Sequence, residues 1–495
     1  MDTHFIYIFQ KFLASWLKAL VLRMKSSSGW LLFSVYFSLF LDSALLTAVV
    51  PILPDYIYHL EHGEGSDLGR LNQSVRSANE TSAHRRNVSS LVSENGKVGL
   101  MFASKALVQL FSNPVTGTWT NRVGYRLPLF LGNIVILASC LLFAFGETFP
   151  VLFLARAIQG VGSSCITVAG LGAVASLYPD DSRRSKVMGF TLGGAALGVL
   201  AGYPYGGVLY DFVGKTTPFV VLASFSIVLS VLCALLALPT HEETIVDIVQ
   251  RLRFVKLLFQ PLLRQVSSLT LLMDPYVLIV TGTIGVSTSA IAILEPCLPI
   301  WLMDALAPSK WQLGTVFIPD SLGYLIGAKF FGSLTLALGR WRMAFVCIVL
   351  VALSAALIPE ATSMLYLVVP HFVLGLAIGI IDAAMMPLLA LLVDSRHVAS
   401  YGTVYAIAET AVSFAYCFGP GVSGYLVKAI GFPWVMRSVA MLNLLYCPLL
   451  LLLRNPQLEE EKNALVMNRP ASSNYEAVKA AGGAYTRFNG ETEDE

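Results

Sequence analysis

The sequence predicts an all-α polytopic membrane protein, with twelve transmembrane helices in two pseudo-symmetric six-helix bundles. Of the 495 residues, 56% are hydrophobic and only 13% are charged, and the mean hydropathy is +0.69. Apolar runs recur along the whole chain, each with the roughly 20 residues that a helix needs to cross a bilayer. A mixed-charge connection at 240–273 leaves six runs on each side. Two halves of equal size are the layout of transporters built from repeats around a central site.

The predicted spans follow one another with short connections. They lie at 30–54, 98–120, 127–147, 149–178, 187–209, 217–238, 274–303, 312–337, 343–360, 364–393, 401–427 and 433–453. The predicted parts are an N-terminal tail (1–28), an N-terminal bundle (29–239), a central loop (240–273), a C-terminal bundle (274–453) and a C-terminal tail (454–495). The first tail has no small-residue cleavage site and Lys11 and Lys18 interrupt its apolar run, so we expect neither a signal peptide nor a crossing helix there.

Basic residues predict which side of the membrane each connection faces. They gather before the first span and in alternate connections: Lys11, Lys18, Arg23, Lys25, Arg122, Arg126, Arg183, Arg184, Lys186, Arg251, Arg253, Lys256, Arg264, Arg340, Arg342 and Arg396. Positively charged loops stay in the cytosol, so both tails and the central loop are predicted to be cytosolic. The net charge of +2 is too small to suggest a nucleic-acid partner.

The connection at 61–97 is the one long polar loop between spans. It carries three N-x-Ser/Thr sequons within 16 residues, at Asn72, Asn79 and Asn87. We therefore predict a glycosylated lumenal loop, in agreement with a cytosolic N-terminus. All seven cysteines lie in apolar surroundings, which predicts free, buried thiols.

Ionisable residues inside the spans are the strongest indication of function. Asp42 lies in the middle of the first span, beside Ser43, whose hydroxyl could serve the same cavity. A carboxylate at this depth costs roughly 2.5–3.5 kcal/mol on insertion scales and therefore marks a functional site or a helix–helix contact. The other such residues are Lys105, Arg156, Glu295, Asp382 and Glu409. Carboxylates outnumber cations, which favours a cationic substrate or protons.

This pattern excludes several classes of protein. The number of spans excludes a seven-helix receptor, and a membrane scaffold would not need charges buried in several spans. Nothing in the sequence implies a cofactor, a metal site or covalent chemistry, so we do not expect an enzyme.

Two loops and one span resemble the major facilitator superfamily. GTWTNRVGYR at 117–126 is similar to its loop signature, with Asn121 where an Asp is usual, and GSLTLALGRWR at 332–342 is a weaker echo in the second half. The fifth span contains GGAALGVLAGYPYGG, which looks like the antiporter signature of that superfamily. Ordinary glycine-mediated packing also explains these glycines.

Seven further stretches resemble the vesicular amine transporters, and above all the vesicular monoamine transporters. They are LFLDSALLTAVVPILP, GLMFASKALVQL, ARAIQGVGSSC, AILEPCLPIW, SKWQLG, LVDSRHVASYGTVYAIAE and KAIGFPW, in the family's order and spacing. The resemblance implies a major facilitator fold and a proton-coupled antiporter that loads cationic amines into acidic secretory or synaptic vesicles.

By resemblance, Asp42 and Glu295 match carboxylates that face the protonated amine, and Tyr416 matches an aromatic residue of the same cavity. Ring faces attract cations within about 6 Å, so this combination suits an ammonium. Tyr324 falls at a position associated with the site and its gating, although packing explains a tyrosine there equally well.

The remaining matches concern coupling and gating. Asp382 and Glu409 match the acids tied to proton coupling, and Lys105 matches the cation paired with the second of them. Arg156 matches a conformationally important arginine. In the turn before the eleventh span, Asp394, Arg396 and His397 match an acid-x-Arg-His pattern, which we interpret as a structural gate or loop anchor. For Lys105 and Arg156, a purely structural ion pair is an equal alternative.

Three departures leave the substrate open. Ser43 and Thr288 stand where monoamine members carry Asn, Glu409 stands where they carry Asp, and both cysteines of their lumenal disulfide are missing. Vesicular transport of acetylcholine or another amine, drug/proton antiport at the plasma membrane, and a degenerate binding or trafficking protein remain alternatives. In the last tail, EKNALV at 461–466 and YEAV at 475–478 are similar to signals read by sorting adaptors.

Overall fold

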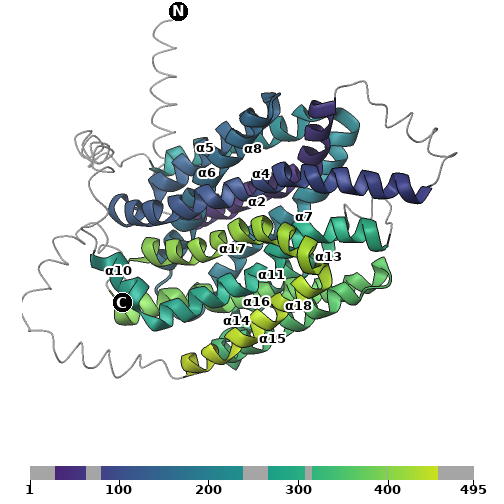
Figure 1. Ribbon diagram of the computed structural model, residues 1–495. Coiled ribbons are helices and arrows are strands. Elements are labelled where there is room, and N and C mark those ends of the chain that lie inside the picture. Colours follow the sequence, from purple (N-terminus) through teal and green to yellow (C-terminus); the bar gives the residue numbers. More distant parts are fainter. Residues whose placement is uncertain (1–27, 63–79, 238–265, 307–314, 398–399, 455–495) are drawn as a thin grey trace, which may run out of the picture. The chain divides into compact units, whose positions relative to one another are not determined.

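The computed structural model describes residues 28–62, 80–237, 266–306, 315–397 and 400–454, and these are almost entirely helical (Figure 1). The helices are α2 (Ser28–His62), α4 (Glu80–Val123), α5 (Arg126–Phe145), α6 (Phe149–Leu177), α7 (Asp181–Val213), α8 (Thr216–Ala237), α10 (Val266–Met273), α11 (Pro275–Ala305), α13 (Ile318–Phe330), α14 (Gly332–Leu338), α15 (Arg340–Leu357), α16 (Met364–Arg396), α17 (Tyr401–Ile430) and α18 (Phe432–Tyr446), with 3-10 turns η4 (Ile358–Glu360) and η5 (Cys447–Arg454). The predicted all-α class is confirmed.

Within these residues, nine helices are long and apolar enough to cross a membrane, and the bent pair α13–α14 raises the number to ten. α4 and α17 are also long, at 44 and 30 residues, but carry more polar side chains. With them, each of the twelve predicted spans has a helix or a helix pair in the structure. The chain is a polytopic membrane protein.

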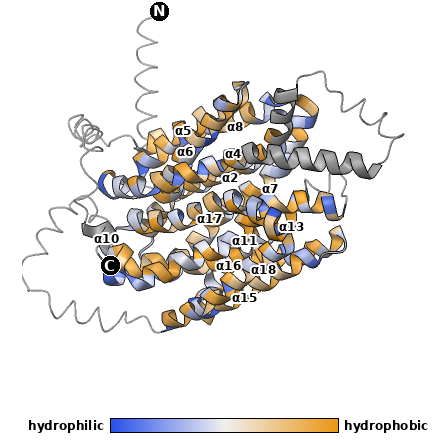
Figure 2. Cartoon of the chain, in the orientation of Figure 1, coloured by the Kyte–Doolittle hydropathy of each residue, from blue (hydrophilic) through white to orange (hydrophobic). Residues whose placement is uncertain are grey.

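The helices carry apolar side chains outward and polar ones inward, the arrangement expected in lipid. On α8, Phe225 and Val228 are more than half exposed, whereas Ser226 and Ser230 are buried. Figure 2 shows that hydrophobic residues predominate along α5, α8, α15 and α18. A large exposed apolar surface of this kind marks contact with a membrane.

Four tight turns recur at equivalent places in the chain and reveal its internal repetition. Each has a glycine with positive φ, a conformation that other residues adopt only with strain. These glycines end α4, α7, α14 and α17: Gly124, Gly214, Gly339 and Gly431. Each of these turns follows the second helix of a group of three helices. The described chain therefore consists of four groups with the same pattern. This supports the duplication predicted from the echo at 332–342.

Helices of the two halves pack directly against each other. α4 packs along α17, and α7 packs along α13. Glycine permits the close approach, since a Cβ on Gly117 of α4 would lie 2.5 Å from Cβ of Ala406 on α17. Within the first half, α2 packs along the glycine-rich face of α7, where a Cβ on Gly198 would lie 2.3 Å from the Phe40 carbonyl.

Several predicted boundaries are wrong or untested. Residues 80–97, predicted to be loop, belong to α4, so Asn87 has a helical backbone. Asn72, Asn79, most of the central loop and both predicted tails except Ser28 and Arg454 lie outside the described residues. The span predicted at 312–337 is bent by 62° between α13 and α14. The last span changes from α18 to the turn η5 at Cys447, because Pro448 lacks the N–H that would continue the helix.

The seven cysteines are free thiols, as predicted. Six are buried and Cys417 is half-buried.

Candidate functional site

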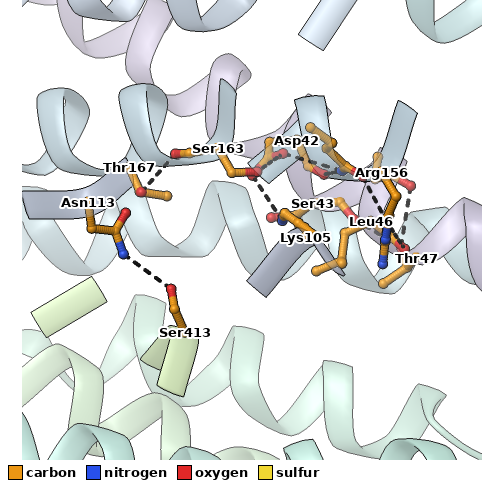
Figure 3. Close-up of polar contacts among 12 residues, drawn as sticks. Asp42, Ser43, Leu46, Thr47, Lys105, Asn113, Arg156, Ser163, Thr167 and Ser413 are labelled. Atoms are coloured by element: carbon orange, nitrogen blue, oxygen red, sulfur yellow. Dashed lines mark hydrogen bonds and ion pairs between the residues drawn. The ribbon is translucent and has the colours of Figure 1, made fainter. Parts of the chain in front are cut away.

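Asp42, predicted as the central carboxylate, is held by three side chains from neighbouring helices (Figure 3). Ser163 of α6 donates a hydrogen bond of 2.5 Å to Oδ1, and Nε2 of Gln159 lies 3.5 Å from the same oxygen. The ammonium of Lys105, on α4, lies 3.6 Å from Oδ2. Asp42 is 4% exposed. The carboxylate is therefore fixed by one cation and two neutral donors.

This contact differs from the pairing that the resemblance implies. The resemblance pairs Lys105 with Glu409, but in the structure the ion pair of Lys105 is with Asp42. Glu409 interacts electrostatically with Lys105, but within the described part of the chain the two do not form an ion pair of 4 Å or less. Lys105 thus interacts with a carboxylate of each half.

Arg156 lies on α6 one turn from Gln159 and is 2% exposed. Its Nη1 donates to Oε1 of Gln159 at 2.8 Å, and its guanidinium lies 5.5 Å from the ring centroid of Phe102. Nε has no hydrogen-bond partner. Arg156 interacts electrostatically with both Asp42 and Glu295, the two predicted substrate carboxylates.

Glu295 of α11, in the second half, accepts a hydrogen bond from a residue of the first half. The hydroxyl of Tyr203, on α7, donates to Oε1 at 3.1 Å. The ring of Tyr203 stacks on Phe317, with 5.8 Å between centroids. Sequence reasoning did not single out Tyr203, and the glycine-rich fifth span also contains Tyr205, so the sequence alone does not show which phenol faces Glu295.

Asp382 and Tyr324 form a contact within the second half. The Tyr324 hydroxyl, on α13, donates to Oδ2 of Asp382, on α16, at 2.7 Å, while Oδ1 has no partner. Asp382 also interacts electrostatically with Glu409 of α17. Tyr416 interacts in the same way with Glu295 and Asp382. Two of the three predicted carboxylates of the second half thus interact with Tyr416.

Ser43 follows Asp42 on α2 and lies at the contact of this helix with α7. Its Cβ lies 2.9 Å from the position that a Cβ would take on Gly198 of α7. Ser43 thus packs with its Cβ at the contact between α2 and α7, and the predicted role of its hydroxyl beside Asp42 stays a prediction.

The predicted gate residues lie at one end of the helices, which we call the basic end and define by Arg184, Arg340 and Arg396. Nε of Arg396 and Nε2 of His397 lie 3.1 Å and 2.9 Å from Oδ2 of Asp274, the residue that caps α11. These contacts tie the end of α16 to the start of α11. They make Arg396 and His397 an anchor at the end of α16, the helix that carries Asp382.

Two ion pairs at the basic end join the halves, and neither was predicted. Arg184 of α7 lies 2.7 Å from Asp394 of α16, and Arg340 of α15 lies 2.7 Å from Asp181 of α7. Asn121 adds a hydrogen bond of 2.6 Å to Thr403, between α4 and α17. Basic residues in loops indicate orientation in a membrane, but sequence alone does not pair them across halves.

Two further buried polar residues were not predicted. Asp320 of α13 lies within the span predicted at 312–337, and the rule that singled out Asp42 would also have found it. His371 of α16 is fully buried. In the middle of the described helices, away from the basic end, Asp320 and the predicted residues make five buried or partly buried carboxylates, against Lys105 and Arg156 as cations. Such an interior can hold an organic cation or protons.

Comparison with known proteins agrees with this fold. The model of the Major Facilitator Superfamily matches residues 32–289 and 277–482. Among solved structures, the human organic anion transporter TETRAN has a TM-score of 0.64 at 18% identity, over 85% of this chain and 99% of that chain. At this identity the likeness shows the fold alone.

Curated relatives are similar along almost their whole length. The synaptic vesicular amine transporter of Homo sapiens is 39% identical, over 92% of this chain and 93% of its own. The chromaffin granule amine transporter of Rattus norvegicus is 38% identical over 89% and 91%, and the vesicular acetylcholine transporter of the same species is 34% identical over 89% and 86%. The resemblance found in the sequence is confirmed, and the chain belongs to the vesicular amine transporter family of the major facilitator superfamily.

Proposed function

We propose that this protein is a proton-coupled antiporter that loads cationic monoamines, of the serotonin, dopamine, noradrenaline and histamine class, into acidic secretory or synaptic vesicles. The observation that carries the proposal is the excess of carboxylates over cations in the interior, contributed by both halves. Asp42 belongs to the first half and Glu295 to the second. A protonated amine bound between these two carboxylates would supply positive charge that the protein itself lacks there.

The amine site is proposed to combine these two carboxylates with the rings of Tyr203 and Tyr416. A protonated amine offers N–H donors to Asp42 and Glu295, and aromatic faces attract its charge. Glu295 and Tyr416 are partly exposed although they lie deep among the helices, so a ligand in the interior can reach them.

Protons are proposed to bind Asp382 and Glu409. Both are less than a tenth exposed and interact with each other as like charges, which favours the binding of one proton between them. A proton on Glu409 would neutralise the charge that attracts Lys105. The ammonium of Lys105 would then interact with Asp42 alone. Protonation in the second half is thereby coupled to the charge that faces the amine.

Alternating access is proposed to use the contacts at the basic end. Arg184–Asp394 and Arg340–Asp181 hold the halves together there, so this conformation is closed at that end. The basic residues predict that this end, and both chain termini, face the cytosol. Rocking of one half against the other would break these pairs and admit the amine from the cytosol.

The test is uptake of a labelled amine panel into acidified vesicles that contain the purified protein, with and without a protonophore. Accumulation of monoamines that collapses with the protonophore supports the proposal. Accumulation of acetylcholine alone would assign the protein to the other branch of its relatives. Binding without accumulation would show a binding protein and refute antiport.

A further inference from the structure

Asp320 is a buried carboxylate that the proposed antiport cycle does not use. It lies on α13, one turn before Tyr324, and is 9% exposed. Its Oδ1 has no hydrogen-bond partner. Among the described residues no ion pair involves Asp320, and its electrostatic neighbour is Glu295, a like charge. An ionised carboxylate in this position needs a cation that the described residues do not supply.

His371 supplies a second acceptor at the same contact between α13 and α16. Its Nδ1 lies 3.0 Å from the Leu367 carbonyl, which can only accept, so Nδ1 carries the proton. In the neutral ring, Nε2 is then an acceptor, and it has no partner. Buried polar atoms without a partner are rare in native structures and call for an explanation.

The two side chains lie at one level of this contact. A Cβ on Gly375, one turn along α16 from His371, would lie 2.9 Å from Oδ1 of Asp320. The ring of Phe317, the residue just before α13, lies 6.3 Å from the His371 ring, centroid to centroid. The same Cβ would lie 1.9 Å from the Asp320 carbonyl oxygen, so glycine at this position lets α16 lie directly against Asp320.

We infer that Asp320, His371 and Glu295 form a second cation subsite, which receives the second ammonium of a diamine while Asp42 faces the first. An alkylammonium has three N–H donors and no acceptor, which matches two carboxylates and an imidazole nitrogen. The stacked rings of Tyr203 and Phe317 offer apolar surface to the carbon chain between the charges, and Tyr416 interacts electrostatically with both Asp320 and Glu295. This inference rests on the proposed amine transport and extends its substrate class to dicationic amines.

The experiment compares two amines that differ by one ammonium, n-pentylamine and 1,5-diaminopentane, with serotonin as the monoamine reference. Uptake into acidified vesicles is measured for the wild type, Asp320→Asn and the control Glu360→Gln, which removes an exposed carboxylate. We expect Asp320→Asn to lower uptake of the diamine by about tenfold or more, the effect of losing one hydrogen bond between charged groups. Uptake of serotonin should change by less than about twofold, and the control should match the wild type.

Two measurements do not depend on this variant. In the wild type, unlabelled 1,5-diaminopentane should inhibit serotonin uptake at lower concentration than n-pentylamine does. In detergent, the diamine should raise the thermal unfolding midpoint of the wild type more than the monoamine does. Equal inhibition by both amines, or a parallel loss of diamine and serotonin uptake in Asp320→Asn, would overturn the inference and leave monoamine transport standing. A wild type that accumulates no amine but is stabilised by the diamine would refute the transport proposal and support the subsite.

Discussion

The ammonium of Lys105 lies 3.6 Å from the carboxylate of Asp42, and both groups are less than a tenth exposed. Ser163 and Gln159 supply the other donors to Asp42. The central carboxylate of the first half is thus already paired before an amine binds. An amine that reaches Asp42 must share it with Lys105 or displace that ammonium toward Glu409.

Neutralising Asp42 should therefore affect both transport and stability. In Asp42→Asn the amine loses its carboxylate, so uptake should fall to background. The buried ammonium of Lys105 also loses its partner, which costs roughly 3–5 kcal/mol when one half of a buried pair is removed. We expect a lower thermal unfolding midpoint for the purified variant than for the wild type.

The double variant Asp42→Asn with Lys105→Met separates the two effects. Removing the lysine charge as well should recover most of the lost stability and none of the transport. Full uptake by a well-expressed Asp42→Asn protein would refute the role of Asp42 in the site. A double variant as unstable as the single one would show that the ion pair contributes little.

A double-mutant cycle tests which carboxylate Lys105 prefers. In the conformation described here, the coupling energy of Lys105 with Asp42 should exceed that with Glu409, within the 0.5–3 kcal/mol typical of contacting residues. The exchange of Lys105→Glu with Glu409→Lys should not restore uptake, because it would set a glutamate against Asp42. Recovery of uptake in the exchanged protein would instead support the pairing that the family resemblance implies.

Hydropathy alone predicted the class of fold, because a bilayer demands long apolar helices whatever their tertiary contacts. The glycines of the fifth span likewise predicted a close helix contact, which the structure places between α2 and α7. The partner of Lys105 was not predictable in the same way. Asp42 and Glu409 lie on different helices, and only packing decides which of them a flexible lysine reaches.

The candidate site, like the fold, was predictable from the sequence only in part. A scan for ionisable residues in spans indicated that Asp42, Glu295 and Asp382 matter, since burial makes each of them costly. It did not predict that Tyr203 bonds to Glu295 or that Arg184 pairs with Asp394, because neutral donors and loop cations carry no such cost. Contacts between residues far apart in sequence come from the fold.

The bond between Tyr324 and Asp382 predicts a graded effect on coupling. Asp382→Asn removes the proposed proton acceptor, so the variant should still bind amine but fail to concentrate it against a gradient. Tyr324→Phe removes only the 2.7 Å hydrogen bond to Asp382. A hydrogen bond to a charged group contributes about 1.5–3 kcal/mol, so this variant should still take up amine, with a shifted pH dependence. Binding and accumulation are compared in the same vesicles. Gradient-driven accumulation by Asp382→Asn would move the proton role to another residue.

The ion pairs at the basic end predict a shift between conformations. Arg340→Ala removes contacts of 2.7 Å with Asp181 and with Ser185, and should favour conformations that are open at this end. The distance between spin labels at Lys186 and Arg342, on α7 and α15, should then increase.

The matched control for this prediction is Arg437→Ala. It breaks an exposed pair with Glu360 inside the second half, which should contribute no more than about 1 kcal/mol and leave the label distances unchanged. Equal distances in Arg340→Ala and the wild type would show that the pair does not hold this end closed.

Two adjacent glycines of α7 give the sharpest test of helix packing. A Cβ on Gly206 would lie 2.5 Å from the Ala48 carbonyl oxygen and 2.7 Å from the Ala48 Cα on α2. Neither atom can move without shifting the helix. A Cβ on Gly207 would meet nothing closer than Cβ of Pro51, at 3.9 Å, which is ordinary contact.

Gly206→Ala should therefore force α2 and α7 apart, at a cost of about 1–3 kcal/mol for overpacking, and lower the thermal unfolding midpoint. Gly207→Ala adds the same methyl group to the next residue and should be neutral, or stabilising by up to about 1 kcal/mol, because alanine loses less freedom than glycine when the helix forms. Because α2 carries Asp42, Gly206→Ala should also lower amine uptake, whereas Gly207→Ala should not. The same loss of stability in both variants would contradict the contact, since it would mean that glycine is needed for the flexibility of α7 and not for its distance from α2.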